Sequence, residues 1–313
     1  MENGSCHSVK RIILKRIHIK LYGGHTGKMK NELLHIGSLT IYGYGLMIAI
    51  GVIAAYLTAE FRAKRKNLDY EKIFNLTIWC AIGGFGGAKL LYYITILDEI
   101  IKDPKLLISS DGLVVFGGII CGIYAGFLFC KRHKVNFLEY FDLVMPSIAL
   151  AQGFGRLGCF MAGCCYGVET DSIIGITFTH SHYAINNVSL VPTQLISSGL
   201  NFLHFLVLVL IAKKVKVHGV IAGCYLMFYS AGRFILEFFR GDLERGNVGS
   251  ISTSQFIAIF TFLFGLAVVI VQLKRNANKA VAFYNEKDGV LIESEDDEDQ
   301  AEQEEEESQE YRL

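Results

Sequence analysis

The sequence predicts an all-α integral membrane protein that crosses the bilayer about seven times. Hydrophobic residues make up 52% of the chain, charged residues only 19%, and the mean hydropathy is +0.38. Proline is nearly absent, with 3 residues, whereas 32 glycines are available for turns and close helix packing. Seven stretches also reach the length of about 20 mostly apolar residues that a bilayer core requires.

The first and last of these stretches carry the strongest signals, because no charged residue occurs from Ile36 to Ala59 or from Ser254 to Leu273. In chain order, we expect the seven spans at 36–59, 73–97, 112–130, 142–162, 193–212, 218–239 and 254–273. The stretch 142–162 has the weakest signal, because it contains Arg156 and a glycine-dense end. A seventh crossing is nevertheless what the charges of the loops require.

Lysine and arginine are distributed unevenly among the loops, and short cytoplasmic loops are the ones enriched in these residues. Alternate loops hold 14 of them, at 60–72, 131–140, 213–216 and 274–279. The intervening loops hold 4, at 98–111, 161–192 and 240–253. The expected topology therefore has the N-terminus outside and the C-terminus in the cytoplasm.

Both ends of the chain differ in composition from the membrane domain expected at 33–275. Residues 1–32 form a basic extension that contradicts the expected orientation and lacks the apolar region of a signal peptide, so we hypothesise that Met29 is the native start. Residues 293–310 hold 12 acidic residues and no basic one, and we expect 276–313 to be a disordered cytoplasmic tail. The remaining basic excess suits cytoplasmic loops, and no nucleic-acid partner is expected.

Five ionisable residues inside the expected spans or directly at a span's end are functional candidates, because each charge inside a span costs about 2.5–3.5 kcal/mol on insertion scales. They are Lys89, Arg156, Arg233, Glu237 and Arg240. Counting from the cytoplasmic ends at about 1.5 Å per residue places the first three roughly 21–24 Å deep, in the outer half of the membrane. For Arg240, at the end of its span, a side chain that merely reaches the interface is an equal alternative.

Arg233, Glu237 and Arg240 have the spacing i, i+4 and i+7, which predicts one helix stripe on which the carboxylate orients the guanidiniums. Several cations at one depth against one acid indicate a site for a lipid phosphate, which arginine binds through two parallel hydrogen bonds. The neighbouring glycines, at 83–87 and 155–167, leave space for a headgroup or serve packing alone. A pore or transporter is the alternative class, but no internal repeat or pair of broken spans supports it.

Three of the eight cysteines form a cluster, Cys159, Cys164 and Cys165, whereas Cys80, Cys121, Cys130 and Cys224 stand alone in apolar stretches. The cluster lacks the Cys-x2-Cys pair or paired histidines of a structural zinc site. We therefore expect no metal and no cofactor, and Cys165 as a space-filling residue. The role of Cys159, directly after Arg156-Leu157-Gly158, stays open.

Six motifs resemble, in order, those of the prolipoprotein diacylglyceryl transferases. The two longest are Gly155-Arg156-Leu157-Gly158-Cys159-Phe160-Met161-Ala162-Gly163-Cys164-Cys165-Tyr166-Gly167 and Gly232-Arg233-Phe234-Ile235-Leu236-Glu237-Phe238-Phe239-Arg240. The others are Tyr44-Gly45-Leu46-Met47, Gly87-Ala88-Lys89-Leu90, Phe116-Gly117-Gly118 and Pro192-Thr193-Gln194-Leu195. The resemblance covers roughly residues 33–275 and identifies that segment as a membrane transferase domain.

The resemblance implies transfer of the diacylglyceryl group of phosphatidylglycerol to the lipobox cysteine of preprolipoproteins at the outer face of the bacterial plasma membrane. The partners are therefore phosphatidylglycerol, preprolipoprotein signal peptides and membrane lipid. The expected catalytic residues are Arg156, Arg233, Glu237 and Tyr44. The expected substrate-binding residues are Arg156, Arg240, Lys89, Gly117, Gly118, Gly158, Cys159, Gly167 and Gln194.

Several positions depart from the family pattern and leave the general base unassigned. Phe116 stands where the family commonly has a histidine, and Lys89 stands for an arginine. Cys159 and Cys164 replace an asparagine and a glutamate, and Ile196-Ser197 replace a Tyr-Glu pair. The alternatives for the base are Glu237, Tyr44, Tyr166, His180 and His182. A diverged homologue that binds phosphatidylglycerol with different or no transferase chemistry is the rival hypothesis.

Overall fold

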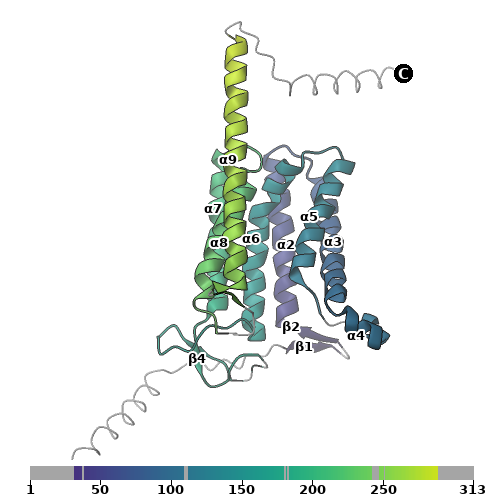
Figure 1. Cartoon of the computed structure of the whole chain (residues 1–313), viewed down its shortest axis with the longest axis vertical. Helices are drawn as coiled ribbons and strands as arrows, with labels where there is room; N and C mark the ends of the chain where they lie inside the picture. The colour runs from purple at the N-terminus through teal and green to yellow at the C-terminus, as the bar shows by residue number, and fades with distance from the viewer. Residues whose placement is uncertain are drawn as a thin grey trace, which may run out of the picture.

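The structure is a computed structural model that describes residues 32–36, 39–108, 112–179, 181, 183–241, 247–249 and 251–287. Seven of its helices are long and apolar enough to cross a membrane, which confirms the predicted class. They are α2 (Gly43–Arg65), α3 (Glu71–Thr95), α5 (Val115–Arg132), α6 (Phe137–Ala162), α7 (Thr193–Lys214), α8 (Val220–Glu237) and α9 (Thr253–Lys287). The helices run nearly side by side (Figure 1).

Short elements gather at one end of the bundle, the lower end in Figure 1. Among the described residues three antiparallel hairpins lie there, so the expectation of an all-α chain holds for the spans but not for the segments outside them. The hairpins pair β1 (Glu32–Ile36) with β2 (Leu39–Tyr42), β3 (Ile176–Thr177) with β4 (Ser189–Leu190), and β5 (Asn247–Val248) with β6 (Ile251–Ser252). Helix α4 (Leu97–Lys102) and the 3-10 turn η1 (Pro104–Ile108) follow α3 at the same end.

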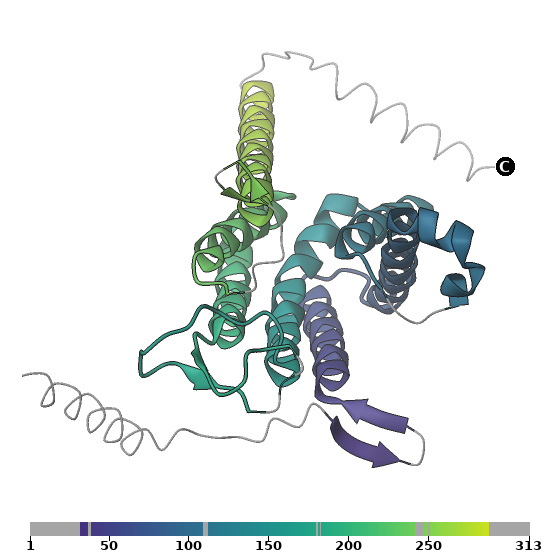
Figure 2. The same cartoon turned by 60° about the horizontal axis from the view of Figure 1, so that its bottom comes forward.

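The expected first span, 36–59, begins too early. Residues Leu39–Tyr42 form a strand paired with Glu32–Ile36, and α2 begins only at Gly43. The alternating β-branched and aromatic residues Thr40, Ile41 and Tyr42 favour a strand, although they carry no charge and so resemble an apolar span. Figure 2 shows this hairpin standing apart from the helices.

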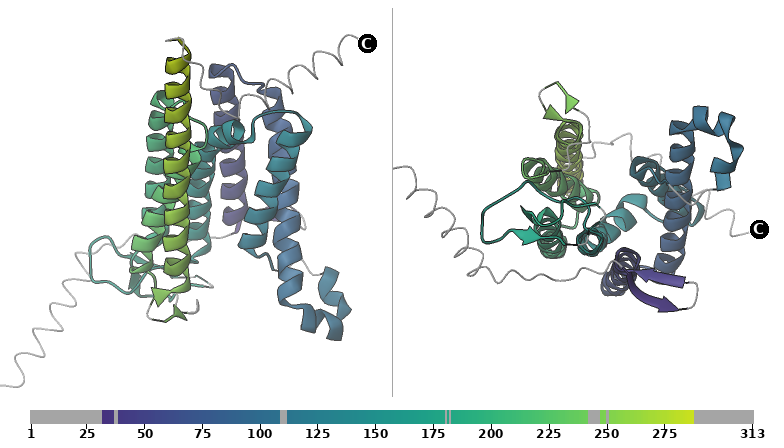
Figure 3. Two further views of the ribbon diagram at one scale, coloured as in Figure 1. Left: turned by 45° about the horizontal axis from the view of Figure 1, so that its top comes forward. Right: turned by 90° about the horizontal axis from the view of Figure 1, so that it is seen from below.

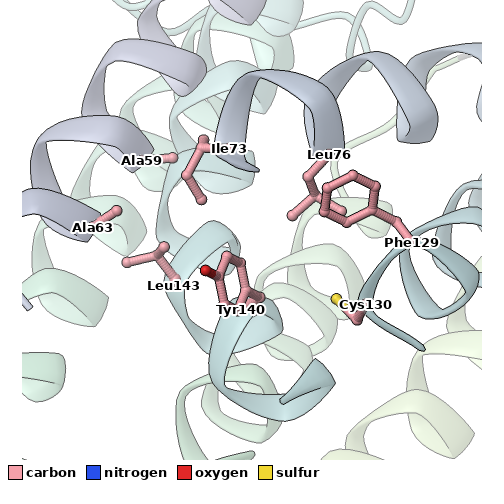
Figure 4. Packing of buried hydrophobic residues seen from close by; sticks show 8 residues of the cluster. All are labelled: Ala59, Ala63, Ile73, Leu76, Phe129, Cys130, Tyr140 and Leu143. Carbon is pink, nitrogen blue, oxygen red and sulfur yellow. The ribbon is translucent and has the colours of Figure 1, made fainter. Parts of the chain in front are cut away.

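A buried hydrophobic cluster joins four helices at the end of the bundle opposite the hairpins (Figure 4). Its residues come in pairs from α2, α3, α5 and α6: Ala59 and Ala63, Ile73 and Leu76, Phe129 and Cys130, Tyr140 and Leu143. In the most apolar part of each spanning helix, only 11–39% of the residues are buried inside the protein. Most side chains of these helices therefore face outward, as a lipid environment requires.

Helices α3 and α5 pack closely because glycines face each other between them. A side chain at Gly117 would drive its Cβ into the carbonyl oxygen of Gly87, and one at Gly118 would lie 3.0 Å from that of Gly84. Small residues at such crossings let helix backbones approach. This pair lies to one side of the bundle, away from α7, α8 and α9 (Figure 3).

Helix α6, the weakest of the predicted spans, is a continuous helix at the centre of the fold. Asn136 caps its first turn by accepting a hydrogen bond from the Glu139 amide at 3.2 Å. The helix ends at Gly163, whose φ of +74° suits glycine. Buried Asp142 accepts hydrogen bonds from the amides of Gly219 and Ala222, at 2.6 and 2.8 Å, and so fixes the start of α8 against α6.

The last helix is longer than the sequence predicted. We expected disorder from residue 276, but α9 continues to Lys287 and projects beyond the other helices (Figure 1). Alanine, lysine, arginine and glutamate in 274–287 have a high intrinsic helix propensity, which a search for apolar stretches does not register. Residues 1–31 and 288–313, including the proposed start at Met29, lie outside the described residues.

Candidate functional site

Three arginines line one small cavity at the hairpin end of the bundle. Arg156 lies six residues before the end of α6, Arg233 lies four before the end of α8, and Arg240 follows α8 in the chain. The cavity has a volume of about 20 Å³, which is room for one water-sized group. Its other lining residues are Cys165, Thr193, Gln194, Ser197 and Leu236. The predicted grouping of Arg156, Arg233 and Arg240 is therefore present in the structure.

The guanidinium of Arg233 is held from two sides. Its Nη1 forms an ion pair with Oε2 of Glu237 at 2.5 Å, and its Nη2 donates a hydrogen bond to Oγ of Ser254 at 2.9 Å. Both members of the ion pair are largely buried, with side-chain exposures of 14% and 9%. Glu237 does not line this cavity, nor the larger cavity described below. Because it pairs with Arg233, it serves to orient that guanidinium.

The predicted helical stripe is wrong for Arg240, because α8 ends at Glu237. Arg240 reaches the cavity through an antiparallel bridge to Gly167. Backbone hydrogen bonds fix the segment around Gly167 on both sides. The Gly167 amide donates to the Val191 carbonyl at 3.0 Å, and the Gly241 amide donates to the Tyr166 carbonyl at 3.2 Å. A Cβ at Gly167 would lie 2.6 Å from the Val191 oxygen, so the glycine permits this close backbone contact.

A larger cavity of about 280 Å³ lies between α7 and α8 and shares Arg156, Arg233, Ser197 and Leu236 with the small one. Most of its remaining lining is apolar. The polar residues deeper in the membrane are Asn201, His204 and Tyr229. Sequence reasoning missed these three, although a histidine and an asparagine inside an apolar span were a visible signal of function.

The three clustered cysteines come together beside the arginines. Their sulfur atoms all lie within 4.8 Å of one another. Cys159 lies near the end of α6, the chain reverses at Gly163, and Cys165 adopts a left-handed conformation with φ of +59°. The side chains of Thr193 and Gln194, both at the start of α7, donate hydrogen bonds at 2.8 Å to the carbonyls of Cys165 and Cys164.

Hydrogen bonds from the thiols of Cys159 and Cys164, together with the positive charge of Arg240, lower the pKa of Cys165. The phenol of Tyr44, at the start of α2, lies within electrostatic range of all three thiols and of Arg156. Of the expected site residues Tyr44, Cys159 and Gln194, only Gln194 lines the arginine cavity. Cys159 lies beside Cys165, which also lines it.

Three expected substrate-binding residues do not reach either cavity. Lys89 lies on α3, with its Nζ 5.0 Å from the ring centres of Tyr92 and Tyr93, and Gly117 and Gly118 form the α3–α5 contact described above. In this structure Gly117 and Gly118 allow the close packing of α3 and α5.

Two further motif residues, Gly158 and Phe116, line neither cavity. Gly158 lets α6 approach α2, since its Cβ would lie 3.2 Å from the backbone oxygen of Tyr44. Phe116, which replaces the family histidine, lies half-exposed on α5 and lines neither cavity. His180 and His182 lie outside the described residues. Among the candidates for the general base, the structure therefore describes the positions of Tyr44, Tyr166 and Glu237.

Comparison with known proteins agrees with the resemblance seen in the motifs. The family model of the prolipoprotein diacylglyceryl transferases matches residues 31–271, most of the chain. The chain belongs to this family. It is 45% identical over 241 residues to the phosphatidylglycerol–prolipoprotein diacylglyceryl transferase of Clostridium tetani, covering 77% of this chain and 96% of that protein.

Other members of the transferase family show a similar extent of likeness. Transferase 2 of Clostridium perfringens is 44% identical over 240 residues, covering 76% of this chain and 93% of that protein. The Finegoldia magna transferase is 33% identical over 249 residues, covering 79% and 96%. Together with its seven spanning helices, this membership makes the chain a multi-pass membrane protein of the bacterial plasma membrane.

Proposed function

We propose that the chain transfers the diacylglyceryl group of phosphatidylglycerol to the lipobox cysteine thiol of preprolipoproteins, the first step of lipoprotein maturation. The observation that carries the proposal is the grouping of Arg156, Arg233 and Arg240 around one cavity. Relatives named for this activity are 45% and 44% identical to the chain over the matched residues.

The small cavity suits the phosphate of an anionic lipid. Glu237 offsets one of the three positive charges, so the group keeps an excess that favours a phosphodiester. Arginine binds phosphate through two parallel hydrogen bonds, and Glu237 and Ser254 hold the Arg233 fork in place for this purpose.

The larger cavity suits the glycerol backbone and the upper part of the acyl chains. It begins at the same arginines and is bordered by Leu200, Leu203 and Phe228, which are 43%, 55% and 42% exposed. Side chains this exposed on a spanning helix face lipid, so the cavity meets the bilayer from the side. A membrane lipid enters here without leaving the bilayer.

The reaction follows from these two placements. The sulfur of the substrate cysteine attacks the glycerol carbon that bears the phosphate ester, a C–S bond forms, and the C–O bond breaks. Glycerol phosphate leaves with the electron pair of that bond and gains a second negative charge. Arg156, Arg233 and Arg240 stabilise this developing charge, which is typically the largest contribution to such catalysis.

The site faces the outer side of the membrane in the orientation that the loop charges favour. Lysine and arginine occupy the last turns of α2, α5 and α7, which all end opposite the cavities. Cytoplasmic ends carry this excess. The N-terminus then lies outside and the C-terminus inside, and the site meets a signal peptide whose cysteine has just emerged from the bilayer.

Complementation of a transferase-depleted bacterium tests the proposal, with thioether lipid on a reporter lipoprotein as the readout. We expect the full chain to restore lipid attachment and Arg156→Ala to abolish it. Lys72→Ala is the control, because Lys72 pairs with Asp69 at the opposite end of the bundle. Failure of the inserted wild-type chain to restore lipid attachment, combined with retained binding of phosphatidylglycerol vesicles, would favour the diverged homologue instead.

A further inference from the structure

The three thiols of Cys159, Cys164 and Cys165 have the geometry of a three-ligand metal site. Zinc–sulfur bonds of about 2.3 Å separate the sulfurs of such a site by roughly 3.8–4.0 Å, whether the arrangement is tetrahedral or planar. The three sulfurs here all lie within 4.8 Å of one another. Side-chain rotations that move each sulfur by less than about 1 Å therefore suffice to bring them onto one ion.

The backbone that carries these thiols is fixed before any ligand binds. The Cys164 amide donates to the Cys159 carbonyl at 3.1 Å and closes the turn at the end of α6. Thr193 and Gln194 lie on α7 and are 4% and 1% exposed. Their side chains donate hydrogen bonds to the carbonyls of Cys165 and Cys164, respectively. The spacing of the three cysteines along the chain fits no common zinc motif, but this turn brings their thiols together.

Gln194 supplies a second observation, independent of the thiols. Its amide nitrogen donates to the Cys164 carbonyl, which aims the amide oxygen elsewhere. That oxygen is buried and has no partner among the described residues, although Gln194 lines the small cavity with Cys165 and Arg156. A buried acceptor without a partner is unfavourable, and a bound group at the cavity would offset that cost.

The charges around the cluster also favour a metal bound by thiolates. Three thiolates with one divalent cation carry a net charge of −1, and Arg156, Arg233 and Arg240 surround the cavity that Cys165 lines. Three protein ligands leave the fourth tetrahedral position open, which distinguishes catalytic zinc sites from structural ones. Because Cys165 lines the same cavity as the arginines, the cluster adjoins the proposed phosphate site.

We propose that Cys159, Cys164 and Cys165 bind one Zn²⁺ ion whose open position takes the thiol of the substrate cysteine as a thiolate. This inference rests on the proposed function and names its activating group. Zinc binding releases the protons of the three protein thiols. On coordination, the substrate thiol releases its proton to solvent and keeps its electron pair, which then forms the C–S bond as the C–O bond to glycerol phosphate breaks.

The proposal removes the need for a protein base at the site. Phe116 cannot accept a proton and lies on α5, away from both cavities. Glu237 is engaged with Arg233. Coordination to zinc deprotonates a thiol outright, so the nucleophile forms without either residue. The nucleophile and the phosphate it displaces then meet at one cavity.

Metal analysis of the full chain, purified in detergent without chelators, is the first test. We expect about one zinc per chain. Cys159→Ser, Cys164→Ser and Cys165→Ser should each lose most of it, whereas Cys224→Ser, a cysteine alone on α8, should retain it. Wild-type protein that is free of zinc and transfers at full rate, or a Cys164→Ser/Cys165→Ser double variant that stays active, would overturn the inference.

Cobalt substitution separates a catalytic ion from a structural one and does not depend on turnover. In Co²⁺-loaded wild-type protein, a lipobox peptide should change the sulfur-to-cobalt absorption, and the same peptide with serine in place of cysteine should not. An unchanged spectrum with both peptides would show that the substrate thiol does not coordinate. A disulfide among the three cysteines in the active, purified enzyme would equally refute the site.

These outcomes keep the two proposals apart. If the wild-type chain holds zinc and the cysteine peptide changes the cobalt spectrum, yet no lipid is transferred, the proposed function fails and the site stands. If lipid is transferred at the same rate after complete removal of zinc, the function stands and the site fails. Thermal unfolding of each serine variant shows whether a lost activity reflects a lost fold.

Discussion

Replacing Arg233 by lysine tests whether a fixed guanidinium fork, and not positive charge alone, drives the transfer. In the structure, one nitrogen of the fork pairs with Glu237 and another donates to Ser254. Lysine has a single nitrogen, which cannot keep the pair with buried Glu237 and also bind the phosphate. It will stay with the carboxylate, because separating a buried ion pair costs about 3–5 kcal/mol.

The expected loss follows from the role of the fork in the transition state. Removing one preorganised donor to a developing negative charge costs about 10²–10³ in rate. Ser254→Ala removes a hydrogen bond from a charged donor, worth about 1.5–3 kcal/mol. Because the ion pair with Glu237 still holds the fork, we expect only the lower part of that range to appear in the rate, a loss of about tenfold. The two variants should therefore differ by one to two orders of magnitude.

The assay is the transfer of labelled diacylglyceryl from phosphatidylglycerol vesicles to a lipobox peptide, with kcat/KM measured for each variant. Thermal unfolding in detergent controls for the fold. Arg233→Lys activity within about threefold of wild type would refute the reasoning, and so would a greater loss in Ser254→Ala than in Arg233→Lys. The first result would mean that charge alone suffices at this position, and the second that the fork does not act through the phosphate.

Three further predictions concern the packing of α3 on α5, the buried carboxylate of Asp142 and the C-terminal residues. Gly117→Leu should lower the unfolding temperature and the yield of inserted protein, because its Cβ would clash with the Gly87 oxygen, whereas Gly86→Leu, with nothing within 4 Å, should be tolerated. Asp142→Ala should destabilise by about 1–3 kcal/mol, since two amides at the start of α8 lose their acceptor, and thermal unfolding measures this. Deleting 288–313 should leave transfer within a few-fold of wild type, because α9 ends at Lys287 about 50 Å from its first residue at the hairpin end.

The sequence predicted the spans well because hydropathy over about 20 residues is a strong physical requirement of the bilayer. Errors arose where that requirement says nothing. Residues 39–42 are apolar yet form a strand, and residues 274–287 are polar yet continue α9. Hydropathy shows whether a segment tolerates lipid. It does not show whether the residues next to the bilayer core form a helix or a strand.

The site was predicted in part, and the division has a physical cause. Arg156 and Arg233 were found because an isolated charge inside a span is costly and therefore conspicuous. Lys89 is equally conspicuous, yet depth along a helix says nothing about which neighbour the helix packs against, and α3 packs on α5 away from the arginines. Depth could be counted from the sequence, whereas lateral position required the fold.

The cysteine cluster shows the same limit for ligand spacing. Zinc motifs along a chain assume that two ligands come from one tight turn, and Cys159, Cys164 and Cys165 do not fit that pattern. They converge because the helix ends at a glycine with φ of +74°, and because Cys165 adopts φ of +59° while side chains of α7 hold the carbonyls. Three thiols lie within 4.8 Å of one another, and Cys165 lines the arginine cavity at which we propose that a thiol substrate reacts. This proposal gives the cysteines a chemical reason to stand where the family has polar residues.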